Sequence, residues 1–446
     1  MRIIILLLMM SGTARGAELA LSLRGAEESA VRASSQYKAA RFSAEAAASA
    51  ASAAGWLLSP RLSLEGSLRY NTVVPEILMP AALGGARPLG DKLNYSAGPS
   101  AYWMLDGGTL KSNSRAASKI AWARTAEAEH AKRQAVLKAR TAYFLLQLAL
   151  ERVYLIGENL QLSFSQLRDI SLGAKAGTRS RLDELRASQE NLARRRDLLR
   201  ARADLAAALR DYSFITGAVL PGDASRALDA RMTGRDYGTE PAALFVRAEP
   251  YEEILRRLLP AAAGRLDENL PAVKVYAETA QAHKYYAGAY RAEKYPRLSL
   301  SARSSLDYPN GPNLYSFLQN SAALSLSLPL FESGRSAERE RESEYNARAA
   351  QEKKTEAELA ARRDFEKALD AYNALMAEQE LNVEAVDDAA EAAKLSYEAY
   401  KAGGGTWLEV ESANLKELQA KTASASTNAE ILLKLAVLDS LNGSVK

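Results

Sequence analysis

Hydrophobic and polar residues alternate strictly in two short segments that lie in different halves of the chain. In Arg61–Tyr70 the even positions are apolar or glycine and the odd positions are polar, and Arg297–Tyr308 largely repeats this alternation. A period of two predicts β-strands, each with one apolar and one polar face. Strands of about ten residues with this pattern are typical of outer-membrane proteins, in which one face contacts lipid and the other a wet lumen.

A second alternating segment follows each of these strands. Apolar residues share one face in Tyr95–Leu105, and in Leu324–Leu330 the leucines alternate with Ser325 and Ser327. The sequence therefore predicts two hairpins, with loops over 72–94 and 309–318. Surface strands of a soluble sandwich are the alternative. Because four strands cannot close a barrel, lipid exposure would require several chains to share one.

Long proline-free stretches predict very long helices. No proline occurs between Pro99 and Pro221 or after Pro329, and proline breaks helix interiors. A helix of about 67 residues would rise roughly 100 Å. Glycines mark the expected reversals between antiparallel helices. We expect helices from about 108 to 175, from Gly177 to Gly217, from about 334 to 401, and from the Gly403–Gly405 turn to Asn442.

These helices carry a seam with alternating spacings of three and four residues, which indicates lengthwise coiled-coil packing. The same phase recurs 226 residues later in the chain. The first seam contains Ala139, Tyr143, Leu146, Leu150, Val153, Gly157 and Leu160, and the second contains Phe365, Leu369, Tyr372, Met376, Gln379, Val383 and Val386.

The two halves are copies of one pattern. Residues 176–183 return as 402–409, and the Leu105–Gly108 motif returns as Phe331–Gly334. Such a long period indicates a duplicated half-protein rather than a solenoid. We expect a leader at 1–16, a first repeat over 17–220, a linker or equatorial segment over 221–265, and a second repeat over 266–446.

The N-terminus is typical of a secretory signal peptide. Arg2 precedes the apolar run Ile3–Met10, and Ala14-Arg15-Gly16 supplies small residues for cleavage. No later segment approaches 18 uninterrupted apolar residues, so no transmembrane helix is expected. The chain contains no cysteine, which excludes disulfides and thiol chemistry, and 58 basic against 54 acidic residues give no argument for nucleic acid.

The residues indicate no catalytic, cofactor or metal site. His130 and His283 lie in different halves without ligand-like spacing, which favours a structural or solvated role over zinc binding. The Gly403–Gly405 run lacks the Gly-Lys dipeptide of a phosphate loop, so a helix reversal is the better interpretation. We therefore expect no enzyme activity.

The order of these elements resembles the TolC family of outer-membrane efflux proteins over nearly the whole mature chain. The motifs that carry the resemblance are Pro60-Arg61-Leu62, Leu105–Gly108, Leu328–Gly334 and the two Ala-Gly helix turns. The resemblance implies an α+β membrane protein, a TolC-like homotrimeric channel. Three chains would share a twelve-stranded β-barrel, four strands each, above a coiled-coil tunnel in the periplasm of a Gram-negative bacterium.

The resemblance also implies partners. It places the chain in a tripartite efflux or type I secretion system, as a passive conduit for small molecules or polypeptides. Its partners would be outer-membrane lipid, a periplasmic adaptor (membrane fusion) protein and an inner-membrane pump of RND, ABC or MFS type. An exported coiled-coil structural or surface protein without channel activity is the alternative.

Family members close the periplasmic end of the tunnel with side chains near the helix turns. By position, the resemblance assigns this role to Tyr400, Glu409 and Asp183. Gly405 and Ser412 stand where some members place a gate arginine and a second gate aspartate, and Arg179 is a candidate substitute for that arginine. Without the resemblance, the sequence favours just as much that Asp183 and Glu409 stabilise the N-termini of their helices. The tips of the two turns would be Gly177, Gly403, Gly404 and Gly405.

Overall fold

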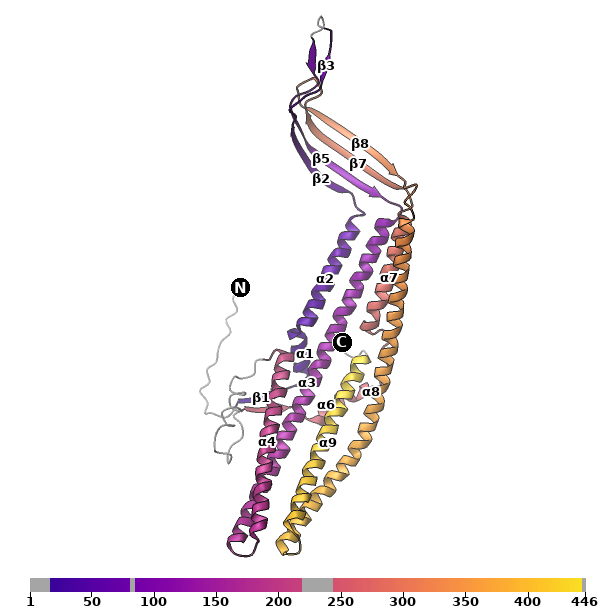
Figure 1. The fold of residues 1–446 in the computed structure, drawn as a ribbon. Coiled ribbons are helices and arrows are strands. Elements are labelled where there is room, and N and C mark those ends of the chain that lie inside the picture. The colour runs from indigo at the N-terminus through magenta and orange to yellow at the C-terminus, as the bar shows by residue number, and fades with distance from the viewer. Residues whose placement is uncertain (1–16, 81–84, 219–243, 443–446) are drawn as a thin grey trace. The chain divides into compact units, whose positions relative to one another are not determined.

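The computed structural model describes residues 17–80, 85–218 and 244–442, so the expected leader at 1–16 lies outside the described part (Figure 1). The chain forms two compact units. One comprises the described parts of Met1–Lys38, Glu129–Leu270 and Leu359–Lys446, and the other those of Ala39–Ala128 and Pro271–Glu358. Each unit therefore combines segments from both sequence repeats.

Secondary structure divides between the units as follows. The first contains β1 (Ala17–Leu21), α1 (Leu23–Ala33), α4 (Arg181–Thr216), β6 (Leu244–Ala248), α6 (Tyr251–Leu258), the 3-10 turn η2 (Leu259–Ala261) and α9 (Trp407–Leu441). The second contains β2 (Arg61–Tyr70), β3 (Glu76–Leu78), β4 (Ala86–Pro88), β5 (Leu93–Leu105), α7 (Pro271–Ala292), β7 (Arg297–Tyr308) and β8 (Phe317–Ser327). Three helices contribute to both: α2 (Ser35–Trp56), α3 (Thr109–Lys175) and α8 (Arg335–Ala402).

The predicted long helices are confirmed to within a few residues. Helices α3 and α8 contain 67 and 68 residues, and glycines with positive φ follow each of them at the turn. Gly217, with φ of 68°, ends α4 as a left-handed cap. No helix in the described part of the chain is both long and apolar enough to cross a membrane.

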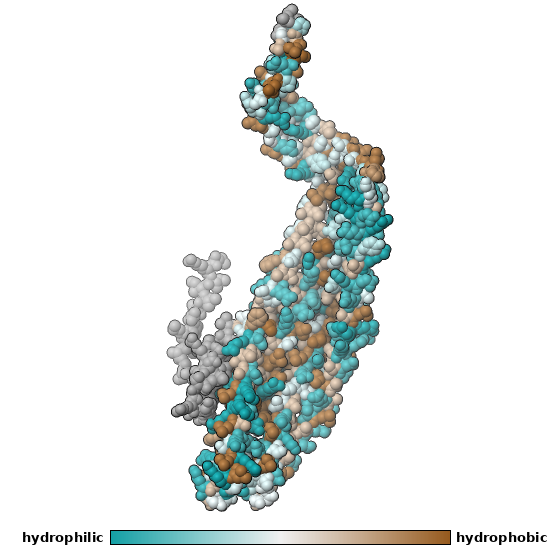
Figure 2. Space-filling model, in the orientation of Figure 1, coloured by the Kyte–Doolittle hydropathy of each residue, from teal (hydrophilic) through white to brown (hydrophobic). Residues whose placement is uncertain are grey.

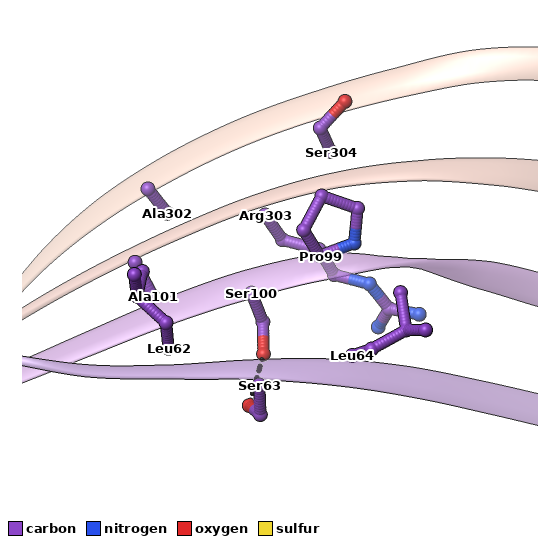
Figure 3. Close-up of a pocket in the computed structure, with 9 residues that line it drawn as sticks. All are labelled: Leu62, Ser63, Leu64, Pro99, Ser100, Ala101, Ala302, Arg303 and Ser304. Atoms are coloured by element: carbon purple, nitrogen blue, oxygen red, sulfur yellow. Dashed lines mark hydrogen bonds between the residues drawn. The ribbon is translucent and has the colours of Figure 1, made fainter.

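Both predicted hairpins pair into one antiparallel sheet with strand order β2-β5-β7-β8. The register aligns the apolar faces across all four strands: Leu64 lies opposite Pro99, and Leu300 lies between Trp103 and Leu324. On the opposite face, serine hydroxyls join neighbouring strands, as in the 2.7 Å contact between Ser63 and Ser100 (Figure 3). The alternation in the sequence therefore corresponds to an amphipathic sheet, with an apolar face and a polar face.

The apolar face of this sheet is largely uncovered in the single chain. Leu62 and Leu64 on β2 are 81% and 82% exposed, and Leu324 and Leu326 on β8 are 66% and 69% exposed. Hydrophobic residues accordingly appear on the surface over these strands (Figure 2). An exposed apolar area of this kind marks a surface that contacts lipid or protein.

The second hairpin differs from the prediction at its end. Strand β8 begins at Phe317 and stops at Ser327, so Leu328 and Leu330 are not strand residues. Pro329 explains the early end, because it has no backbone N–H to donate to a neighbouring strand. In the first hairpin, the expected loop contains the small β3-β4 ladder.

A hydrophobic core in the first unit joins α1, α3, α4, α6, α8 and α9. It includes the seam residues Tyr143, Leu146 and Tyr372, which confirms burial of the seam at this level, whereas Val383 further along α8 is 51% exposed. The fully buried large side chains of this core are Leu23, Tyr143, Phe144, Leu146, Ile254, Ile431, Leu432, Leu435 and Leu438.

Tyr143 connects this core to the chain segments around it. Its hydroxyl donates to the carbonyl of Leu21 at 2.9 Å and accepts from the backbone N–H of Glu249 at 2.8 Å. Burial raises the pKa of Tyr143 to about 12, so the hydroxyl stays protonated at neutral pH. One buried side chain thereby fixes the ends of β1 and β6 against α3.

We predict that Tyr143→Phe destabilises the first unit by about 1–3 kcal/mol, because the carbonyl of half-buried Leu21 and the N–H of half-buried Glu249 lose their shared partner. Urea unfolding of the purified chain measures this. Tyr212→Phe is the matched control, since its ring packs 6.4 Å from that of Tyr143 and the substitution leaves the bridge intact. Equal losses in the two variants would contradict a specific role for the bridge.

Candidate functional site

The turn between α3 and α4 is fixed by glycine and by a cap. Gly177 has a φ of 76°, a conformation that L side chains rarely adopt. The N–H of Thr178 donates to the carbonyl of Gly173 at 2.9 Å, and the Ser180 hydroxyl accepts from the N–H of Asp183 at 3.1 Å. Ser180 is thus the N-cap of α4, and it places Asp183 in the first turn of that helix.

The turn between α8 and α9 has the equivalent construction. Gly403 has a φ of 84°, and Thr406 begins α9 with a capping box. In it, the N–H of Thr406 donates to Oε2 of Glu409 at 2.9 Å, while the N–H of Glu409 donates to the Thr406 hydroxyl at 3.4 Å. A Cβ at Gly405 would lie 3.3 Å from that same Glu409 oxygen, so a larger residue would crowd the cap.

The two turns meet in a small apolar cluster. Tyr400 and Trp407 pack edge to face with ring centroids 5.5 Å apart. Ile170 of α3, Ala187 of α4 and Val410 of α9 complete the cluster, and each is almost fully buried. Four helices from both repeats therefore converge on two aromatic rings.

Arg179 connects the first turn to the end of α8. Its two terminal nitrogens donate to the carbonyls of Tyr400 at 2.9 Å and Lys401 at 3.0 Å, and its guanidinium lies 4.3 Å from the centroid of the Tyr400 ring. The last carbonyls of a helix lack partners within the helix, so Arg179 caps α8 from a different hairpin. Gly173 allows this approach, because a Cβ there would lie 2.5 Å from Cγ of Arg179.

The structure brings three of the four sequence-predicted side chains together. Tyr400 and Asp183 lie 3.5 Å apart, hydroxyl to carboxylate, beside Arg179. Burial and the nearby Asp183 charge raise the pKa of Tyr400. Glu409 is exposed and engaged with Thr406, so it stands apart from this group.

Residues that the sequence reasoning missed extend the contact. The Tyr397 hydroxyl donates to Asp169 at 2.9 Å, and burial, followed by this hydrogen bond, raises the pKa of Tyr397 to about 12. Trp407 is 1% exposed. Tyr397 lies three residues before Tyr400 on the same helix face, and this spacing was the available signal.

Nothing in the described ranges groups three or more His, Cys, Asp or Glu residues in a way that could hold a metal ion. His130 lies on α3 and His283 on α7, both half-buried. The arrangement at the turns joins the ends of two helical hairpins by ring stacking, by helix capping, and by hydrogen bonds between tyrosine hydroxyls and carboxylates.

We predict that Arg179→Ala accelerates amide hydrogen exchange at the end of α8 by about 10- to 100-fold, since it removes two carbonyl contacts and a cation–π stack. Arg179→Lys should restore only part of the protection, because an ammonium cannot reproduce the planar fork. Exposed Arg181, which pairs with Glu184 in the neighbouring turn, provides the control Arg181→Ala. Unchanged exchange in Arg179→Ala would show that the contact contributes nothing.

Comparison with known proteins connects this architecture to one family. The family model described as outer membrane efflux protein matches residues 27–218 and 263–444. No curated protein sequence matched the chain.

Solved structures match the chain over most of its length. The CmeC outer membrane channel of Campylobacter jejuni is 16% identical, with 94% of this chain and 85% of that chain covered and a TM-score of 0.73. The outer membrane protein VceC of Vibrio cholerae is 19% identical, with coverage of 94% and 96% and a TM-score of 0.71. The MtrE outer membrane channel of Neisseria gonorrhoeae, in its open state, is 19% identical, with coverage of 95% and 89% and a TM-score of 0.72. At these identities the likeness establishes the fold.

Proposed function

Since the chain belongs to the outer membrane efflux protein family and is an outer-membrane channel component of an efflux system, we propose that it works as a homotrimeric, passive conduit without catalysis. The observation that carries this proposal is the four-stranded sheet with one mainly apolar and largely exposed face. Such a face is suited to lipid, and the serine-rich opposite face to water.

The edges of the sheet support the trimer. Among the residues that the structure describes, β2 pairs only with β5, and β8 pairs only with β7, so each edge strand has one side without a partner strand there. Unpaired edges of about ten residues invite pairing with another chain. Joining β8 of one copy to β2 of the next is a head-to-tail contact, which closes into a ring when the rotation is one third of a turn. Three copies would then form a twelve-stranded barrel.

We further propose that the helix turns form the closed end of the conduit. Three-fold symmetry would turn each side chain there into a ring around the axis. Arg179, Tyr400 and Asp183 would hold neighbouring hairpins together in the closed state, and the exposed Glu409 would face the passage. Carboxylates about 6 Å apart repel by roughly 1–3 kcal/mol per pair, so a ring of Glu409 favours cations or opening.

The proposed partners are those that the family resemblance implies. A passive conduit needs an energised inner-membrane pump, of RND, ABC or MFS type, and a periplasmic adaptor to connect the two. Cargo would be small molecules or, in a type I secretion system, polypeptides. We propose that these partners bind at the helix turns, where both helical hairpins end.

Lipid contact by the sheet is tested with a pair of neighbouring substitutions. Leu64→Arg should destabilise the bilayer-inserted protein by about 2–4 kcal/mol if the residue lies near the midplane. Ser63→Arg, on the polar face of the same strand, should cost far less. Unfolding from lipid vesicles measures both values. Equal tolerance of the two arginines would contradict the assignment of the apolar face to lipid.

A test of the proposed position of Glu409 must distinguish the effect of its charge from the effect of its hydrogen bond to the Thr406 N–H. Glu409→Gln removes the charge while its amide oxygen can still accept from the Thr406 N–H. We expect lower selectivity for cations over anions in planar bilayers, measured as the reversal potential in a salt gradient. Glu409→Ala should in addition weaken the start of α9. If Glu409→Gln leaves the reversal potential unchanged, Glu409 is a cap and no part of the passage.

A further inference from the structure

A second layer of side chains lies next to the apolar cluster of the turns, and it is polar. It is formed between α3, α4 and α9, and every member is at least 93% buried. We refer to it as the polar layer. Its members are Ser163, Gln166, Glu190, Asn191, Arg194 and Asn414.

Most of the polar layer is hydrogen-bonded across helices. Asn414 of α9 donates to Gln166 of α3 at 3.0 Å, and Asn191 of α4 is 3.5 Å from Ser163 of α3. Glu190 and Arg194 are the exceptions: Arg194 bonds within α4, and its Nε has no hydrogen-bond partner among the described residues. Glu190 is 4% exposed, and neither of its carboxylate oxygens has a hydrogen-bond partner among the described residues. A buried carboxylate without partners is costly when charged, so its proton is held by the packing.

The charges around Glu190 come from two helices. Arg194 lies on the same helix, one turn further on, and donates to Asp197 at 3.3 Å rather than forming an ion pair with Glu190. Glu411 approaches from α9, and α3 presents the uncharged Gln166. Burial raises the pKa of Glu190 to about 7; Glu411 acts in the same direction, whereas Arg194 and Asn414 act against it.

We propose that Glu190 is a proton-sensitive joint between α4 and α9. With the proton bound, the polar layer stays dry and the two helices pack closely near their turns. When the proton leaves, the carboxylate needs water, and the layer separates to admit it. If the turns form the closed end of a conduit, loosening the polar layer makes that end easier to open. This consequence for opening rests on the proposed function.

The direction of the effect follows from linkage. In the separated state, hydrated Glu190 returns toward its ordinary pKa of 4.5, whereas in the packed state its pKa is about 7. The packed state therefore binds the proton more tightly, and its advantage is full below about pH 4.5 and is lost as the pH rises to about 7. Higher pH thus loosens the joint.

Thiol labelling of the full-length chain tests the proposal without background, because the protein has no cysteine of its own. Ala187→Cys places a reporter at a position that is 1% exposed, one turn from Glu190. Gln189→Cys, at an exposed position of the same helix, corrects for the intrinsic pH dependence of a thiol. The reagent is an uncharged methanethiosulfonate, applied between pH 5 and 8.

The ratio of the two labelling rates should rise with pH by up to about 100-fold in the native background, which is the size that a pKa difference of this kind allows. With Glu190→Gln, which mimics the protonated carboxyl, the ratio should stay low at all pH values. Glu391→Gln, an exposed carboxylate change on α8, should leave the rise intact. If Ala187→Cys does not fold, Val410→Cys on α9 serves as the buried reporter.

Two results would overturn the joint: a ratio that is independent of pH in the native background, or the same rise in Glu190→Gln. Both concern packing within one chain. A protein that conducts no ions would therefore contradict the proposed function without affecting this measurement, and a flat ratio in a conducting trimer would contradict the joint alone.

Discussion

The long helices depend on alanine at their contacts. Buried positions along α3 are largely alanine, among them Ala131, Ala135, Ala139 and Ala142, and α7 continues the pattern with Ala280, Ala282, Ala287 and Ala289 in the other unit. Short side chains let helices approach closely over many turns. Each alanine removes little apolar surface from water, so packing along the helices is continuous but weak per residue.

Large side chains are therefore concentrated at a few levels, where they set the positions of the helices. In the first unit these are the core around Tyr143 and the cluster around Tyr400 and Trp407. Polar contacts accompany both, because buried hydroxyls and helix-end carbonyls need partners. A helix assembly held in this way can be firm at defined levels and still separate at one of them, which is the behaviour that a gated conduit requires.

Much of this could be predicted from the sequence. Strict alternation identified β2, β5 and β7, since the pleat has a fixed period, and the absence of proline identified α3, α4, α8 and α9. Pro329 could have predicted the end of β8. The alternating leucines around it nevertheless favoured a strand that continues to Leu330. The β1-β6 pair was not predicted, because parallel pairing of short segments that are far apart leaves no local pattern.

The site was predictable only in part, and for the same reason. Turn glycines and first-turn acids follow local rules, so Gly177, Gly403 and Asp183 could be located from the sequence. The contact of Arg179 with the carbonyls of α8 joins residues 221 and 222 positions apart, and nothing local indicates it. Glu190 gives no signal in the sequence either, because burial by three helices is what makes its charge costly.

The proposed function requires three copies of this chain to form one channel through the outer membrane. Planar-bilayer conductance of the detergent-purified chain, with the mass of the same sample determined in parallel, tests this requirement. We expect trimers that give discrete, small conductance steps, because the proposed function places a closed constriction at the helix turns. A water-soluble species without conductance would contradict it and would favour an exported coiled-coil protein instead.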